Sequence, residues 1–100
     1  MSAAIETLLG QLAEHIERAG WQQRTPHPVH PGWCYERGRL LRLSLYYRAT
    51  DQRWTARHSV GGTQIVSATD ADPMVALACA HDSATRILRE TTALLHELST

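Results

Sequence analysis

Apolar residues near the start of the chain recur at steps of three and four, with polar residues between them. They are Ile5, Leu8, Leu9, Leu12, Ile16 and Ala19. This spacing is typical of an amphipathic helix with one buried face, and it predicts a helix over residues 3–19. Ser2 is suited to cap its start and Gly20 to end it in the left-handed conformation.

The middle of the chain changes to a period of two, which indicates strands with one buried face. The apolar positions are Leu41, Leu43, Leu45 and Tyr47 in the first segment and Trp54, Ala56, His58 and Val60 in the second. A turn around Thr50 and Asp51 would pair the two segments as a hairpin, with Leu43 opposite His58. In this register both apolar sets face the same side.

The remaining segments complete an α+β fold. Residues 21–32 contain three prolines and are expected to form an extended connector. Short strands are predicted at residues 33–37 and 63–68. Asp72 followed by Pro73 is typical of the start of a helix, which should continue almost to the C-terminus. We expect a single domain over residues 1–100: an N-terminal helix, a three- or four-stranded antiparallel meander and a long C-terminal helix, with both helices on one sheet face.

The C-terminal helix is long for a domain of this size. About 26 residues of helix span about 39 Å, whereas a compact chain of 100 residues has a radius of gyration of about 13 Å. Its end is therefore expected to extend beyond the sheet and to favour a partner, a second copy included. The candidate oligomer interface consists of Ile87, Leu88, Leu94, Leu95 and Leu98.

Composition and charge narrow the classes of function. Ten basic residues balance ten acidic ones, so no global field attracts nucleic acid or an anionic membrane. With 43% hydrophobic and 20% charged residues, the chain fits a folded globular protein. No segment is apolar enough to predict a membrane span or a signal peptide, so we expect a cytoplasmic protein. In that compartment Cys34 and Cys79 are expected to be reduced thiols.

A local basic surface is the strongest candidate binding feature. Arg42, Arg48, Arg53 and Arg57 would share the polar face of the hairpin with Tyr46. Such a face can be merely solvated, can contact a protein, or can hold phosphates while Tyr46 stacks on bases. Trp33, beside the proline connector, would either pin that connector to the domain or act as an exposed anchor for a partner. We take these six residues as candidate partner-binding residues.

Metal and catalytic sites are not predicted. His27, His30 and Cys34 have a spacing similar to zinc ligands, but a polyproline II segment would separate the two histidines by about 9 Å along its axis. His58 is expected to be a hydrogen-bonded structural histidine facing the core. Known nucleophile, nucleotide-binding and metal motifs are absent from the sequence. We therefore expect no enzyme, no cofactor and no metal.

These observations favour a small binding module that acts as an inhibitor or adaptor by contacting an unidentified protein. All ten basic residues are Arg and Phe is absent, which is typical of a GC-rich bacterial, phage or mobile-element genome, so an anti-defence role is one form of this hypothesis. The alternative is nucleic-acid binding through the arginine-rich face. The element order is similar to that of double-stranded-RNA-binding domains, but residues 70–73 are acidic where those domains carry lysines.

Overall fold

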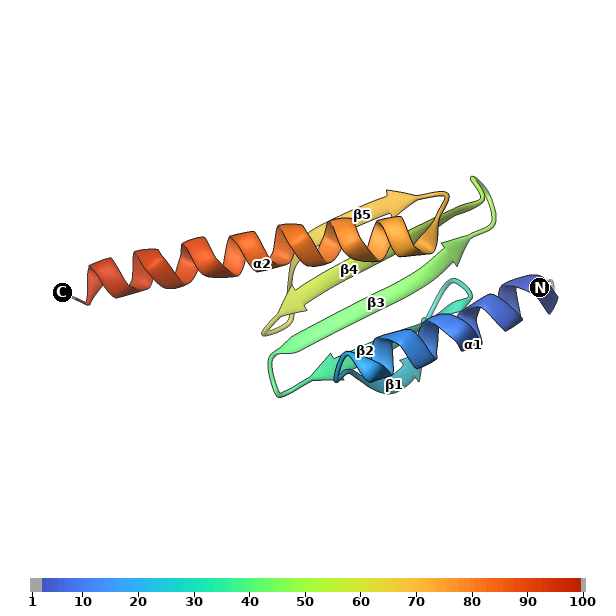
Figure 1. Cartoon of the computed structure of the whole chain (residues 1–100), viewed down its shortest axis with the longest axis horizontal. Helices are drawn as coiled ribbons and strands as arrows, with labels where there is room; N and C mark the ends of the chain where they lie inside the picture. The colour runs from blue at the N-terminus through green and yellow to red at the C-terminus, as the bar shows by residue number, and fades with distance from the viewer. Residues whose placement is uncertain (1–2, 100) are drawn as a thin grey trace.

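The computed structural model of the protein describes residues 3–99 and shows two helices and five strands (Figure 1). In chain order they are α1 (Ala3–Arg18), β1 (Gln22–Pro26), β2 (Gly32–Arg37), β3 (Leu41–Arg48), β4 (Arg53–Val60), β5 (Thr63–Asp70) and α2 (Pro73–Leu98). The predicted α+β class and element order are confirmed. The meander has five strands rather than three or four.

All five strands form one antiparallel sheet in the order of the sequence, β1-β2-β3-β4-β5. The predicted pairing of β3 with β4 is confirmed along its length, with Leu43 opposite His58 and Tyr47 opposite Trp54. A slip of one residue would have moved every apolar side chain to the other face, so the alternating pattern specifies this register strongly.

The strand that the sequence pattern did not predict is β1, which pairs with β2 at the edge of the sheet. Its side chains are almost all exposed, so it lacks the alternation by which the other strands are recognised. The pairing is interrupted by a bulge between Gln23 and Thr25, and the strand ends at Pro26. A proline is tolerated there because an edge strand need not donate every backbone N–H.

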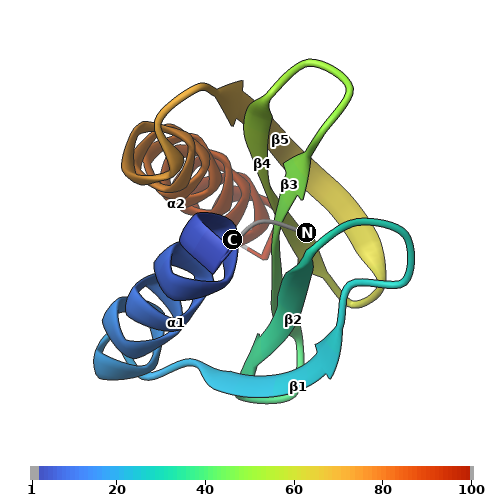
Figure 2. The ribbon, with the colours of Figure 1, turned by 90° about the vertical axis from the view of Figure 1, so that its right-hand side faces the viewer.

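Both helices cover the same face of the sheet, as predicted, and no helix of residues 3–99 lies on the other face (Figure 2). We call these the inner face and the outer face. The main buried residues of the core lie between the helices and the inner face: Leu9, Leu12, Ile16, Tyr35, Leu43, Leu45, Trp54, Ala56, Ala76 and Ala80. Alanines on α2 let this helix approach β4 and β5 closely.

The length of α2 gives the molecule its elongated shape of 55 × 24 × 22 Å. The helix runs back along β5, but its 26 residues span about 39 Å, whereas the eight residues of β5 span about 26 Å. Its C-terminal part therefore extends past the end of the sheet (Figure 1), as the sequence analysis predicted.

The first turn of α2 is capped as predicted. The Asp72 carboxylate accepts a hydrogen bond of 2.9 Å from the backbone N–H of Met74, and Pro73 occupies the first turn. Asp72→Ala is expected to lower the free energy of unfolding by about 1 kcal/mol, because one backbone donor loses its partner. Urea denaturation measures this. Asp82→Ala, which removes an exposed carboxylate from the middle of α2, should change stability much less; an equal loss would contradict the cap.

Candidate functional site

The four candidate arginines lie on the outer face of the β3–β4 hairpin, but two of them are engaged in ion pairs. Arg42 lies 3.4 Å from the Glu36 carboxylate on the neighbouring strand β2, and Arg48 pairs with Asp51 in the adjoining turn. The hydrogen bond from Arg48 lowers the pKa of Asp51 below its ordinary value. The outer face is thus a mixed-charge surface rather than a purely basic one.

Tyr46 is not an exposed stacking platform, contrary to what base stacking would require. Its side chain is only 2% exposed, because residues 27–31 fold back over the outer face. The rings of His27 and His30 stack on the Tyr46 ring with centroids 4.2 and 5.1 Å away. The Arg57 guanidinium lies 5.3 Å from the centroid of the same ring. Nucleobases therefore have no free ring face at this position.

The loop over Tyr46 is held by hydrogen bonds at both ends. The His27 N–H donates to the Gly32 carbonyl over 2.9 Å, and the Tyr47 N–H donates to the Pro31 carbonyl over 2.8 Å. Within the loop, Nδ1 of His27 accepts bonds from the backbone N–H groups of Val29 and His30. We call residues 27–31 the histidine loop.

Gly32, where the histidine loop rejoins β2, is buried against β3. A Cβ atom added to Gly32 would lie 2.6 Å from Cα and 2.7 Å from Cβ of Tyr46, and closer still to the Leu45 carbonyl. Only a residue without a side chain therefore fits at this crossing.

The polyproline geometry expected for this segment is wrong. The histidine loop turns instead of extending, and the rings of His27 and His30 lie 5.7 Å apart between centroids. Cys34 points elsewhere, with its sulfur 3.6 Å from the Ser44 hydroxyl. Among residues 3–99, no group of three or more His, Cys, Asp or Glu side chains is arranged to hold a metal ion.

Trp33 lies on the inner face of the sheet, opposite to the face of the candidate arginines. Together with Trp21 it is partly buried and packs against the core on the inner face. The packing of the two tryptophans holds both ends of the segment from residue 21 to residue 33 on the domain, which is one of the two roles considered for Trp33 in the sequence analysis. The six candidate partner-binding residues are divided between opposite faces of the sheet.

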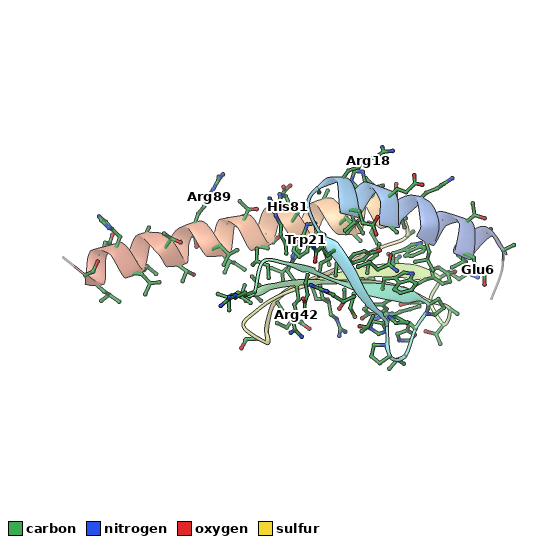
Figure 3. All side chains as sticks on the ribbon, turned by 90° about the horizontal axis from the view of Figure 1, so that it is seen from below. Glu6, Arg18, Trp21, Arg42, His81 and Arg89 are labelled. Carbon is green, nitrogen blue, oxygen red and sulfur yellow. The ribbon has the colours of Figure 1, made fainter. Side chains whose placement is uncertain are left out.

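A cavity of about 260 Å³ lies on the inner face between the two helices. It is lined by His15, Ile16, Ala19, Trp21, Leu43, His58, Met74, Leu77, Ala78 and His81. Trp21 and His81, both labelled in Figure 3, are part of this lining. Periodicity placed His58 on the inner face but could not reveal this cavity, because its walls come from both helices, two strands and the segment after α1.

His58 is the buried polar residue of the cavity, with a side chain only 7% exposed. Its ring centroid lies 5.5 Å from that of Trp21 and 6.5 Å from that of His81. Burial, and secondarily the charge of His81, lower its pKa below 6.5. The expected structural hydrogen bond is missing: within the described part of the chain, no residue bonds to its imidazole.

The lowered histidine pKa values predict a loss of stability in acid. Burial lowers the pKa of His27 as well, with further contributions from His30 and Arg57. Below pH 6.5 the unfolded chain therefore binds protons that the folded protein does not. The stability contributed by the neutral rings is complete above pH 6.5, the ordinary pKa of histidine. It decreases as the pH falls below this value and is lost once the pH has fallen through the folded pKa values.

Urea midpoints at pH 7.5, 6.0 and 5.0 should thus decrease steadily, and less steeply in His58→Phe. Equal midpoints over this range would contradict the buried neutral state of these rings.

The candidate oligomer interface on α2 is solvent-exposed in the single chain. Leu94, Leu95 and Leu98 are 60%, 61% and 83% exposed, whereas Ile87 and Leu88 lie where the helix leaves the sheet. We call residues 87–98 the projecting half of α2. Its charged side chains, such as Arg89 in Figure 3, extend to the other side of the helix.

The chain matches no protein-family model, no curated protein and no solved structure. In residues 3–99, neither helix has an apolar stretch that could traverse a lipid bilayer. Cys34 and Cys79 are both free thiols.

Proposed function

We propose that the protein is a non-enzymatic protein-binding module, an adaptor or inhibitor, that acts in the cytoplasm as a homodimer. The observation that carries this proposal is the apolar stripe of α2, which continues beyond the sheet it covers. Ala80 and Ala84 are buried against the sheet, and the same stripe continues through the exposed half of the helix. Apolar surface with this continuity is typical of an interface.

The stripe has the spacing of a helix–helix contact. From Ala84 the positions alternate between steps of four and three, through Leu88, Thr91, Leu95 and Leu98. This alternation is the heptad pattern that aligns two helices. The charged residues of the projecting half, Arg89, Glu90, His96 and Glu97, fall outside the apolar arc, which spans about 120° with Ile87 and Leu94 included.

A second copy in antiparallel orientation fits this stripe. Packed helices lie about 8–10 Å apart, so a partner helix would occupy the layer that the sheet occupies beneath the first half of α2 (Figure 3). A parallel partner would bring its own sheet into the same space. In the antiparallel pair, Leu88 would face the partner's Leu98 and Thr91 would face the partner's Leu95.

The threonine at the centre of this contact does not present an unsatisfied hydroxyl. The Thr91 hydroxyl donates to the Ile87 carbonyl over 2.7 Å, within its own helix. Its methyl group remains available for packing opposite a leucine. The stripe is short compared with the roughly 800 Å² per partner of a standard interface, so we expect a dissociation constant on the order of 10 µM.

The target protein would bind the outer face, which the dimer leaves open. Arg53 and Arg57 are exposed there, and Arg57 lies beside the Tyr46 ring that the histidine loop covers. Nucleic acid is less well supported as a target, because Glu36 and Asp51 lie among the arginines and Tyr46 is covered. The lysine-free composition supports a GC-rich bacterial, phage or mobile-element origin for such an accessory protein.

Sedimentation velocity over a wide concentration range tests the dimer, which should approach twice the monomer mass of 11.2 kDa. Affinity capture from nuclease-treated host lysate tests whether the protein binds another protein. A protein retained by the wild type should no longer be retained when Arg53 and Arg57 are both replaced by Ala. A monomer at every concentration would overturn the dimer. Salt-sensitive binding to random oligonucleotides, without any retained protein, would overturn the protein-binding function in favour of nucleic acid.

A further inference from the structure

The inner face is not completely covered by the two helices. The α2 helix packs on β4 and β5, whereas α1 contacts the β1 side of the sheet. The views in Figures 1 and 2 show β3 between them. The cavity of about 260 Å³ lies in this position, over Leu43 of β3 and His58 of β4.

The walls of the cavity are mainly apolar. Ile16 and Trp21 come from α1 and the segment after it, and Met74 and Leu77 come from α2. Three histidines provide the titratable groups of the lining, and no Asp, Glu or Arg side chain is part of it. An ionised ligand group would lose part of its hydration against these apolar walls, and no permanently charged side chain of the lining would compensate for that loss, which is unfavourable. The site therefore suits a neutral molecule.

His58 supplies the one buried polar contact point. Its ring lines the cavity, is more than nine-tenths buried and has no hydrogen-bond partner among residues 3–99. Among residues 3–99 no side-chain nitrogen or oxygen that is sealed from solvent lacks a partner, so the ring nitrogens of His58 are open to the cavity and accessible to a bound molecule. A neutral imidazole offers one donor and one acceptor nitrogen, and a hydroxyl group can pair with either of them.

We propose that this cavity binds a small neutral aromatic alcohol, whose ring packs against Trp21 and Leu43 and whose hydroxyl hydrogen-bonds to His58. The size follows from the volume. A protein cavity of about 150 Å³ holds benzene, so 260 Å³ accommodates a ring with short substituents, about ten non-hydrogen atoms in all. This site is independent of the dimer, because the projecting half of α2 contributes none of its lining residues.

The test is an NMR titration of the full chain with 4-propylphenol, and with 4-propylanisole, in which a methyl group replaces the hydroxyl hydrogen. We expect shifts centred on the Trp21 indole, the Leu43 methyl groups and the His58 ring. The dissociation constant of the phenol should be on the order of 0.1 to 1 mM, as its size implies. The anisole should bind about tenfold more weakly, since it has no O–H donor and its ether oxygen is a weaker and more hindered acceptor.

Two variants connect the binding to this cavity. In His58→Phe, which keeps a ring but has no ring nitrogen, the phenol and the anisole should bind equally. Ala78→Phe should block both ligands by filling the cavity, whereas Ala93→Phe, on the solvent side of the projecting half, should leave binding unchanged. Shifts at another site, no saturable shifts at all, or phenol binding that survives Ala78→Phe would overturn the proposal.

Discussion

Gly32→Ala is expected to lower the free energy of unfolding by about 3 kcal/mol, which is among the larger effects of single substitutions. The added methyl group would overlap the backbone of β3 at Leu45 and Tyr46. Main-chain atoms of a central strand cannot rotate away as a flexible side chain can. The overlap would force β2 away from β3 and loosen the histidine loop that starts from this crossing.

Urea denaturation of Gly32→Ala should be compared with that of Gly10→Ala. A methyl group on Gly10, on the exposed side of α1, has no neighbouring atom within 4 Å. Alanine should stabilise a helix there by up to about 1 kcal/mol. The two substitutions are chemically identical, so opposite signs would isolate the effect of the close strand crossing. A Gly32→Ala protein as stable as the wild type would show that β2 lies farther from β3.

Leu95→Asp is expected to weaken self-association about 100-fold or more. In the antiparallel pair, each Leu95 faces the partner's Thr91 in an apolar environment. A single substitution therefore places two carboxylates, without cationic partners, in the contact. The monomer should keep its stability, because Leu95 is 61% exposed in the single chain.

Sedimentation velocity of Leu95→Asp should give the monomer mass at concentrations where the wild type is dimeric. Ala93→Asp is the matched control, because Ala93 is also exposed but lies on the other side of the helix. It introduces the same charge two residues away and should leave the dimer intact. If both variants dissociated equally, net charge rather than the stripe would control association. If neither dissociated, the contact would lie elsewhere.

Local patterns in the sequence were sufficient for most of the fold. The period of two between Leu41 and Val60 gave the β3–β4 register residue by residue, and Asp72 with Pro73 gave the start of α2. Both signals arise from neighbouring residues and need no information about distant contacts. The strand β1 lacks such a signal, because it is polar, short and defined only by its pairing with β2.

The candidate site was less predictable, because its contacts join segments that are distant in the sequence. Alternation placed Tyr46 on the polar face correctly, but nothing in the β3–β4 hairpin shows that His27 and His30 cover it. Glu36 reaches Arg42 only because β2 pairs beside β3. Similarly, the alternation along β4 predicted that the His58 side chain faces inward. Its lack of a hydrogen-bond partner could not be predicted, because it depends on how far apart the two helices lie.

The bulge in β1 also determines how the sheet can grow. A sheet has two edges, and an edge strand with unpaired backbone groups can recruit another strand and begin an ordered aggregate. At β1 the bulge, Arg24 and Pro26 disrupt the pattern that an added strand would need. The opposite edge strand, β5, also has a shift of register in its pairing with β4, between His58 and Ser59, but it is eight residues long and contains no proline. Fibrillar growth on prolonged storage should therefore begin at β5, and Ser67→Lys should slow it.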